Sequence, residues 1–243
     1  MVMLLLAGLL LSGQKEQPEL QGKTFPAITN HLKSIATDGK SIATIHEKAQ
    51  KELAKVIVEQ YKSGNELSII LICTGNSRRS MMGAAMGNAS AAYHGFSDLR
   101  LYSGGTTPSA FNSRSIRALK EIGFKIEPTG EKATAGPKGE ENQVYNVLWG
   151  QGKGLSGIEF SKHYSDPKNP QKDFIALMVC DEADSTCPVV IMGATKRIPV
   201  PFADPKAFDG KPEESTKYSE RRDDIGRFML STLAIAKEQL KNK

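Results

Sequence analysis

The chain has 243 residues, enough to bury a full hydrophobic core, and we expect one domain with an extension rather than two domains. Its 39% hydrophobic and 24% charged residues are typical of a globular protein. The net charge of +5 suits a small anionic substrate. Because the basic residues are scattered and form no nucleic-acid motif, we expect no nucleic-acid partner.

The N-terminus begins with an apolar run, MVMLLLAGLLL. This run is too short to span a bilayer but long enough for the apolar region of a signal peptide. We therefore expect residues 1–13 to be a signal peptide and the protein to be exported, periplasmic or extracellular, without stable membrane insertion. A misplaced start codon, which would make the protein cytoplasmic, and an apolar N-terminal strand are the alternatives.

The first half of the chain after this run alternates helical and strand patterns. Residues 14–40 are polar and carry weak turn signals, and apolar residues at helical spacing predict a helix over 41–61. The run LSIILI at 67–72 predicts a strand buried on both faces. A helix over 79–93, a strand over 98–103, and a helix capped by Asn112 and ending near Ile122 follow.

The second half contains a less regular stretch and then returns to the same alternation. Residues 128–171 are dense in Gly, Pro, Asn and Lys, with VYNVLW and GIEF as a possible hairpin. FIALMVC at 174–180 predicts another buried strand, RIPVPF at 197–202 an edge strand because of its prolines, and residues 212–240 a final helix. This order predicts an α/β fold with an open parallel sheet.

The loop after the first buried strand is the strongest candidate site. In open parallel sheets, ligands bind beyond the carboxyl ends of the strands, where Cys73 stands. Gly75 lets successive amides turn toward an anion, and Arg79 offers a planar fork for two of its oxygens. These groups favour a Cys73 thiolate, to which Ser80 can donate a hydrogen bond. The alternative is a buried core cysteine with surface arginines. The candidate oxyanion-binding residues are Thr74, Gly75, Asn76, Ser77, Arg78, Arg79 and Ser80.

Four motifs together resemble the low-molecular-weight protein tyrosine phosphatase superfamily, and more closely its thioredoxin-coupled arsenate reductase branch. They are CTGNSRRS, YSGGTTPSAFNSRSIRALKEIGF, VCDEADSTCP and PFADP. The resemblance implies a four-stranded parallel sheet flanked by helices, in a domain of residues 65–243 that follows a helical extension, 14–64, and carries the hairpin-like insertion 128–171. It also implies that Cys73 is the nucleophile, Arg79 the oxyanion clamp and Asp204 the general acid.

Asp204 fits the role of general acid on its own surroundings as well. It follows a strand end, and Pro205 stiffens the chain after it, so that its carboxyl group can protonate a departing oxygen. An aspartate that only forms a turn is the alternative.

The remaining cysteines, Cys180 and Cys187, distinguish the branches of the family. The resemblance to the reductases implies that Cys180 attacks the arsenate adduct on Cys73, that Cys187 then attacks Cys180, and that a thioredoxin-like protein reduces the resulting disulfide. A structural disulfide or two ordinary buried cysteines are the alternatives. The expected function is arsenate reduction; hydrolysis of phosphotyrosine or another phosphomonoester, and oxyanion binding without turnover, are the alternatives.

Some positions depart from the family or stay open. Ala84 replaces a glutamate that helps relatives to organise a cation, and the four histidines show no ligand spacing, so we expect neither a metal nor a cofactor. Phe208 is a single aromatic residue where phosphatases place adjacent tyrosines. Ser103, Asn76 and Ser115 can support the loop. The insertion, with its aromatic residues Tyr145, Trp149, Phe160 and Tyr164, is either a lid or, as we prefer, a hairpin that covers a sheet edge.

Overall fold

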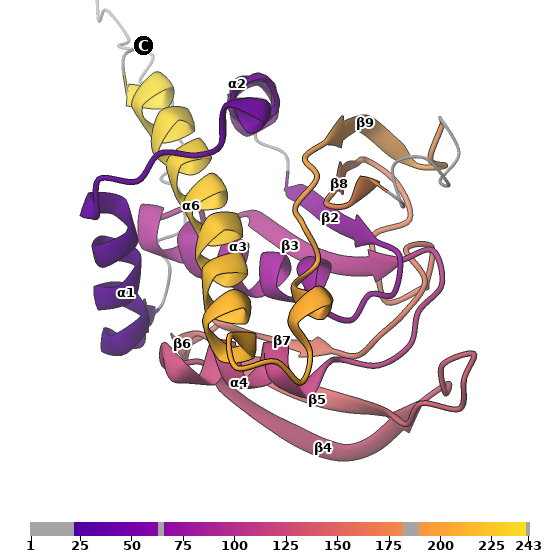
Figure 1. Ribbon diagram of the computed structural model, residues 1–243. Helices are drawn as coiled ribbons and strands as arrows, with labels where there is room; N and C mark the ends of the chain where they lie inside the picture. Colours follow the sequence, from indigo (N-terminus) through magenta and orange to yellow (C-terminus); the bar gives the residue numbers. More distant parts are fainter. Residues whose placement is uncertain (1–21, 63–65, 182–189, 242–243) are drawn as a thin grey trace, which may run out of the picture.

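A parallel sheet of four strands lies at the centre of the molecule, in the order β3-β2-β8-β9 (Figure 1). The computed structural model describes residues 22–62, 66–181 and 190–241, so the expected signal peptide, residues 1–13, and Cys187 lie outside the described residues. The predicted α/β fold with four parallel strands is confirmed. Its strands are β2 (Leu67–Cys73), β3 (Leu99–Gly105), β8 (Phe174–Met178) and β9 (Ala194–Pro199).

Helices flank this sheet, and the most buried of them directly follows the candidate loop. α3 (Arg79–His94) packs on β2 and β3 and against the long α6 (Glu214–Lys241), which also contacts α2 (Glu47–Lys62). A Cβ atom at Gly83 would overlap Leu71 of β2, and one at Gly87 would overlap Leu101 of β3. The small residues after the loop therefore let α3 approach the sheet closely.

α4 (Ser113–Glu121) begins as the sequence predicts. The Asn112 side chain accepts a hydrogen bond from the backbone N–H of Arg114 and caps the helix. The chain leaves α4 through Gly123, whose φ of +106° is a conformation that glycine adopts without strain.

The N-terminal segment is more ordered than its composition suggests. The expectation of weak turns over residues 14–40 is wrong between 26 and 37, which form α1 (Pro26–Thr37). Ile28, Leu32 and Ile35 recur at helical spacing and are buried in a cluster shared with α3 and α6. Before α1, β1 (Gly22–Thr24) pairs antiparallel with β6 (Gly150–Gly152).

The following helix is shorter than predicted. α2 begins at Glu47, after a single 3-10 turn, η1 (Thr44–His46), rather than at residue 41. Ile45 fits the helical spacing in the sequence, but 71% of it is exposed, because the chain at that point has not yet entered the helix.

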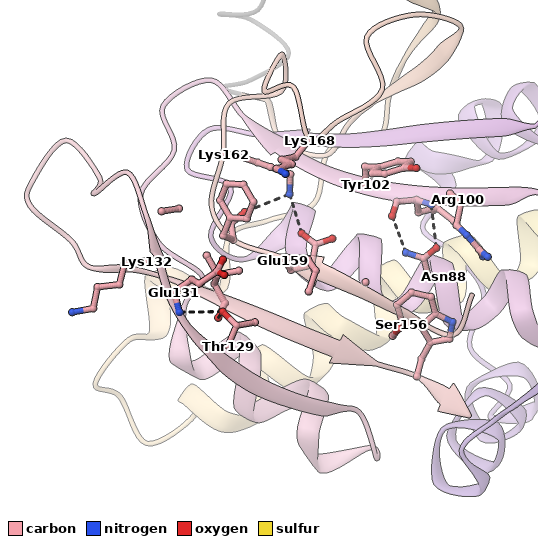
Figure 2. A pocket seen from close by; sticks show the side chains of 17 residues that line it. Asn88, Arg100, Tyr102, Thr129, Glu131, Lys132, Ser156, Glu159, Lys162 and Lys168 are labelled. Atoms are coloured by element: carbon pink, nitrogen blue, oxygen red, sulfur yellow. Dashed lines mark hydrogen bonds and ion pairs between the residues drawn. The ribbon is translucent and has the colours of Figure 1, made fainter. Parts of the chain in front are cut away.

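The insertion forms an antiparallel sheet in the order β4-β5-β7, with β4 (Lys125–Ala133), β5 (Asn142–Leu148) and β7 (Ser156–Glu159). The expected hairpin is confirmed as β5 and β7. β4 was not expected, because most of its side chains are exposed and Pro128 interrupts it at an irregular register. This sheet lines a cavity of about 770 Å³ together with residues of β3 and α3. Figure 2 shows the side chains that surround it.

The insertion also returns to the central sheet and covers the edge strand β3 at one point. The Gly105 N–H donates to the Lys162 carbonyl (3.0 Å), and the Tyr164 N–H donates to the Gly105 carbonyl (3.1 Å). The expectation that the insertion covers a sheet edge is therefore confirmed there.

At the opposite edge of the sheet, prolines alternate with residues whose N–H groups donate hydrogen bonds to β8 and the residue after it. β9 begins at Ala194, three residues earlier than predicted, and lies at the edge beside β8, as expected. The Val200 and Phe202 N–H groups donate to the carbonyls of Met178 and Val179 (2.7 and 3.1 Å). Pro199, the last residue of β9, and Pro201, which follows the strand, alternate with these donors and have no N–H of their own, so both fit at a sheet edge.

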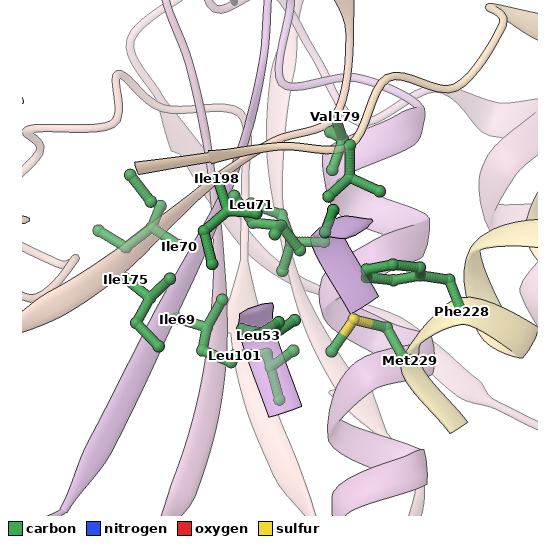
Figure 3. Close-up of a cluster of buried hydrophobic side chains, with 14 of the residues drawn as sticks. Leu53, Ile69, Ile70, Leu71, Leu101, Ile175, Val179, Ile198, Phe228 and Met229 are labelled. Atoms are coloured by element: carbon green, nitrogen blue, oxygen red, sulfur yellow. The ribbon is translucent and has the colours of Figure 1, made fainter. Parts of the chain in front are cut away.

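The main hydrophobic core lies between the sheet and its helices. Figure 3 shows Ile69, Leu71, Leu101 and Ile175 of the strands facing Phe228 and Met229 of α6, and each of these side chains is buried. Full burial of one such side chain contributes about 1.5–3 kcal/mol. None of the helices that the structure describes is long and apolar enough to cross a bilayer.

Candidate active site

The candidate loop connects β2, which ends at Cys73, to α3, which begins at Arg79. Cys73 is buried, with 3% of its surface exposed, and its Sγ lies 3.1 Å from the Ser80 Oγ in the first turn of α3. The loop therefore holds the thiol at the carboxyl edge of the sheet and beside the start of a helix, where an anion is stabilised by the helix dipole.

The carbonyl groups of the loop accept hydrogen bonds from another segment of the chain. Those of Cys73, Thr74, Gly75 and Ser77 accept hydrogen bonds of 2.8–3.1 Å from backbone N–H groups of Thr106, Thr107, Ser109 and Asn112, in the segment between β3 and α4. In a trans peptide the C=O and the following N–H point in opposite directions. This segment therefore turns the amide groups of the loop as a set, the arrangement that an oxyanion site requires.

Asn76 contacts Ser80, which in turn contacts Cys73. Its φ of +39° is uncommon for a residue other than glycine. Its Oδ1 accepts a hydrogen bond from the Lys162 N–H (2.8 Å), so its Nδ2 faces the Ser80 Oγ and donates to it (2.9 Å). The Ser80 oxygen that accepts this bond also lies 3.1 Å from the Cys73 Sγ, close enough for a hydrogen bond between the hydroxyl and the thiol.

Arg79 and Asp204 are adjacent, although 125 residues separate them in sequence. The Arg79 side chain is only 7% exposed; it donates to the Phe202 carbonyl (3.1 Å) and forms an ion pair with the Asp204 Oδ2 (2.8 Å). The other oxygen of Asp204 accepts from the Lys206 N–H (3.0 Å) and caps the 3-10 turn η2 (Pro205–Phe208). This arrangement orients a carboxyl group, 33% exposed, beside the candidate anion site.

The Arg78 side chain contacts Tyr218 and Asp209, unlike that of Arg79, which pairs with Asp204. Its guanidinium donates to the Tyr218 hydroxyl (2.7 Å) and to the Asp209 Oδ2 (3.1 Å). The Tyr218 hydroxyl donates to the other oxygen of Asp209 (2.7 Å), and burial, followed by this hydrogen bond, raises the pKa of Tyr218 to about 12. The contribution of Arg78 to an oxyanion site would therefore come from its backbone N–H. Sequence reasoning missed Asp209 and Tyr218, since no local pattern links them to the loop.

Cys180 lies next to the loop. β8 runs parallel to β2, and the Val179 N–H donates to the Ile72 carbonyl (2.9 Å), so the two chains leave the sheet side by side. The Cys180 Sγ, which is fully buried, lies 3.6 Å from the Thr74 Oγ1. The structure therefore brings Cys73 and Cys180 to the same edge of the sheet, while Cys187 stays a prediction outside the described residues.

Two of the three residues expected to support the loop, Ser103 and Ser115, form no hydrogen bond with it among the described residues. Ser103 donates to the Glu159 carboxylate (2.8 Å) and to the Met81 sulfur (3.3 Å), whereas the Ser115 hydroxyl is buried without a hydrogen-bonding partner among the described residues. Of the three, Asn76 is the one that donates a hydrogen bond to Ser80, the neighbour of Cys73. The described part of the chain contains no group of three His, Cys, Asp or Glu residues that could hold a metal ion.

Comparison with known proteins finds a family match over part of the chain. Residues 68–141 match the family model of low molecular weight phosphotyrosine protein phosphatase. Arsenate reductases from two strains of Staphylococcus epidermidis, one of them arsenate reductase 2, are each 27% identical to this chain over 158 residues, which cover 65% of this chain and 89% of each relative.

Solved structures with lower sequence identity include phosphatases and an arsenate reductase. The low molecular weight protein tyrosine phosphatase from T. tengcongensis is 17% identical, with a TM-score of 0.43, and the match covers 69% of this chain and 97% of that one. The thioredoxin-dependent arsenate reductase from Corynebacterium glutamicum is 16% identical, with a TM-score of 0.36 and coverage of 85% and 84%. By sequence, the chain is thus similar to low molecular weight phosphotyrosine protein phosphatase over residues 68–141 and to arsenate reductases over 158 residues.

Proposed function

We propose that this protein is an arsenate reductase that uses Cys73 as nucleophile and Cys180 and Cys187 as a disulfide relay. The observation that carries the proposal is the position of Cys180, whose sulfur lies 3.6 Å from the side chain of Thr74, the first residue after Cys73. Hydrolysis of a phosphomonoester needs no second thiol there. The arsenate reductases among the sequence relatives support the same reaction.

The proposed first step is attack of the Cys73 thiolate on arsenate. The amides of the loop and the Arg79 guanidinium bind the arsenate oxygens, and a hydroxyl group leaves as water after accepting a proton. Asp204 is the candidate proton donor, because Arg79 holds it at the edge of the site (2.8 Å). The product of this step is an arsenate thioester on Cys73.

The second step reduces arsenic. The Cys180 thiolate attacks the Cys73 sulfur, the sulfur–arsenic electron pair stays with arsenic, and arsenite leaves as a Cys73–Cys180 disulfide forms. The two electrons gained by arsenic are those that the two thiolates lose. Cys187 then attacks Cys180 and releases the Cys73 thiolate. A thioredoxin-like dithiol reduces the Cys180–Cys187 disulfide, and if residues 1–13 direct export, this reductant must be extracytoplasmic.

Phosphatase activity is the second candidate, because Cys73, Arg79 and Asp204 suffice for it. The ion pair between Arg79 and Asp204 favours it, since it sets a carboxyl group near the anion site. Phe208, where phosphatases place adjacent tyrosines, is half-buried, and two ammonium groups, those of Lys211 and Lys217, lie 5.4 and 5.5 Å from its ring centre. The two functions are compared by measuring arsenite formation, with a thioredoxin system, and aryl phosphate hydrolysis on the same preparation. Hydrolysis without any arsenite would reject the reductase.

Asp204→Asn tests the general acid. The amide keeps the size of the side chain but cannot give up a proton, so aryl phosphates with poor leaving groups should be cleaved about 10²–10⁴-fold more slowly, and those with good leaving groups much less so. The measurement is kcat/KM over a series of leaving-group pKa values. Asp166→Asn, at an exposed turn of the insertion, is the matched control. Equal slowing across the series would rule out proton donation by Asp204.

A further inference from the structure

Residues of the insertion touch the back of the oxyanion loop at two points. The Lys162 N–H donates to Asn76 (2.8 Å), and the Ser161 hydroxyl donates to the Gly75 carbonyl (3.0 Å). The first contact holds the Asn76 side chain and the second the peptide between Gly75 and Asn76, where the backbone enters its left-handed conformation. A non-glycine residue in this conformation is strained and persists only where its surroundings hold it.

Ser161 bridges two segments. Its hydroxyl accepts a hydrogen bond from the Ser109 N–H (2.9 Å) while it donates to Gly75. The Ser109 N–H and hydroxyl also donate to the Gly75 carbonyl (3.0 and 3.2 Å). The Gly75 carbonyl is therefore fixed jointly by the segment after β3 and by the insertion.

Asn142, the first residue of β5, holds the backbone of Ser161. Its Oδ1 accepts from the Ser161 N–H (3.0 Å), and its Nδ2 donates to the Ser161 carbonyl (2.7 Å). Asn142 and Ser161 are 2% and 3% exposed, so water cannot replace these bonds without rearrangement. A pair of opposed hydrogen bonds of this kind fixes both the position and the direction of the segment.

Lys162, the residue after Ser161, is anchored by its side chain. Figure 2 shows the Lys162 ammonium directed at Glu159 across the wall of the cavity, at 3.1 Å. The Lys162 side chain is 3% exposed, and the same Glu159 carboxylate accepts from Ser103 of β3 (2.8 Å). The segment that supports Asn76 is thus tied to the edge strand of the central sheet as well as to β5.

We propose that Asn142 and Ser161 are positioning residues for the oxyanion loop and for Cys73. They act through Gly75 and Asn76, and Asn76 donates to the Ser80 hydroxyl, which lies beside the Cys73 sulfur. Both lie beyond residues 68–141, the part of the chain that matches the family model. The inference rests on the proposed oxyanion chemistry of the loop but holds for arsenate and phosphate alike.

The test measures how well inorganic phosphate protects Cys73 of the full chain from iodoacetamide, read by mass spectrometry of the peptide that carries Cys73. Ser161→Ala should raise the half-protecting phosphate concentration about 5-fold and Asn142→Ala about 10-fold or more, as expected when hydrogen bonds that hold an anion site are lost. Ser165→Ala, at an exposed position in the same segment, should stay within about 2-fold.

A double-mutant cycle separates positioning from general stability. If Asn142 acts in part through Asn76, then Asn142→Ala should change phosphate protection by a smaller factor in the Asn76→Ala background than in the wild type. A lower melting temperature with wild-type protection in Asn142→Ala and Ser161→Ala would overturn the inference. Should Asn142→Ala fail to fold, Ser161→Ala decides alone. Absence of protection in the wild type would contradict the oxyanion site itself, a result distinct from equal protection in wild type and variants.

Discussion

Cys73→Ser should abolish both arsenate reduction and aryl phosphate hydrolysis, with a loss on the order of 10⁴-fold or more. The serine hydroxyl has nearly the size of the thiol but is not ionised near neutral pH, so the nucleophile is lost while the site keeps its shape. The loop should remain intact, because its carbonyls are held by backbone groups of the segment between β3 and α4 rather than by the Cys73 side chain.

The measurement combines initial rates on both substrates with phosphate binding by isothermal titration calorimetry. Phosphate affinity in Cys73→Ser should stay within about 3-fold of the wild type, since backbone amides and a guanidinium bind the anion. Thr37→Ser, at an exposed position of α1, is a control for handling and folding. Undiminished turnover in Cys73→Ser would remove Cys73 from the mechanism, whereas lost phosphate binding would mean that the sulfur also maintains the loop.

Cys180→Ala should block arsenite release almost completely yet leave aryl phosphate hydrolysis within about 3-fold of the wild type. Without the second thiolate, no group is placed to attack the Cys73 sulfur and leave the electron pair on arsenic. The proposed hydrolysis depends on Cys73, Arg79 and Asp204 and needs no second thiol. The fully buried Cys180 side chain is small, so its truncation leaves only a small cavity.

Disulfide mapping after one turnover checks the order of the relay. Reduced wild-type protein given arsenate and no reductant should release about one arsenite per chain and end with a Cys180–Cys187 disulfide. Cys187→Ala should instead accumulate the Cys73–Cys180 disulfide, because the last attacking thiolate is missing. Fast aryl phosphate hydrolysis without arsenite, in the wild type and in both variants, would reject the reductase and favour the phosphatase.

Local sequence was enough to predict the elements that build the loop. The continuous apolar run of β2 reads as a strand buried on both faces, and the segment of α3, rich in Ala and Met, reads as a helix. Asn112 and Gly123 mark the two ends of α4. In each case the signal lies within a few residues, because propensity, capping and burial on both faces are properties of a short segment. The helical spacing of Ile28, Leu32 and Ile35 is a local signal of the same kind for α1.

The sequence alone thus determined the α/β class and the candidate loop after Cys73, because each depends on patterns along the chain. Only the tertiary structure decided which distant groups meet. Arg79 pairs with Asp204, Arg78 turns away to Asp209 and Tyr218, and Ser161 reaches Gly75 across 86 residues. The parallel order of β2 and β8 brings Cys180 beside Thr74. These contacts follow from strand order, register and the path of the insertion. Packing of the whole chain sets all three, so no short segment of the sequence is enough to predict the contacts.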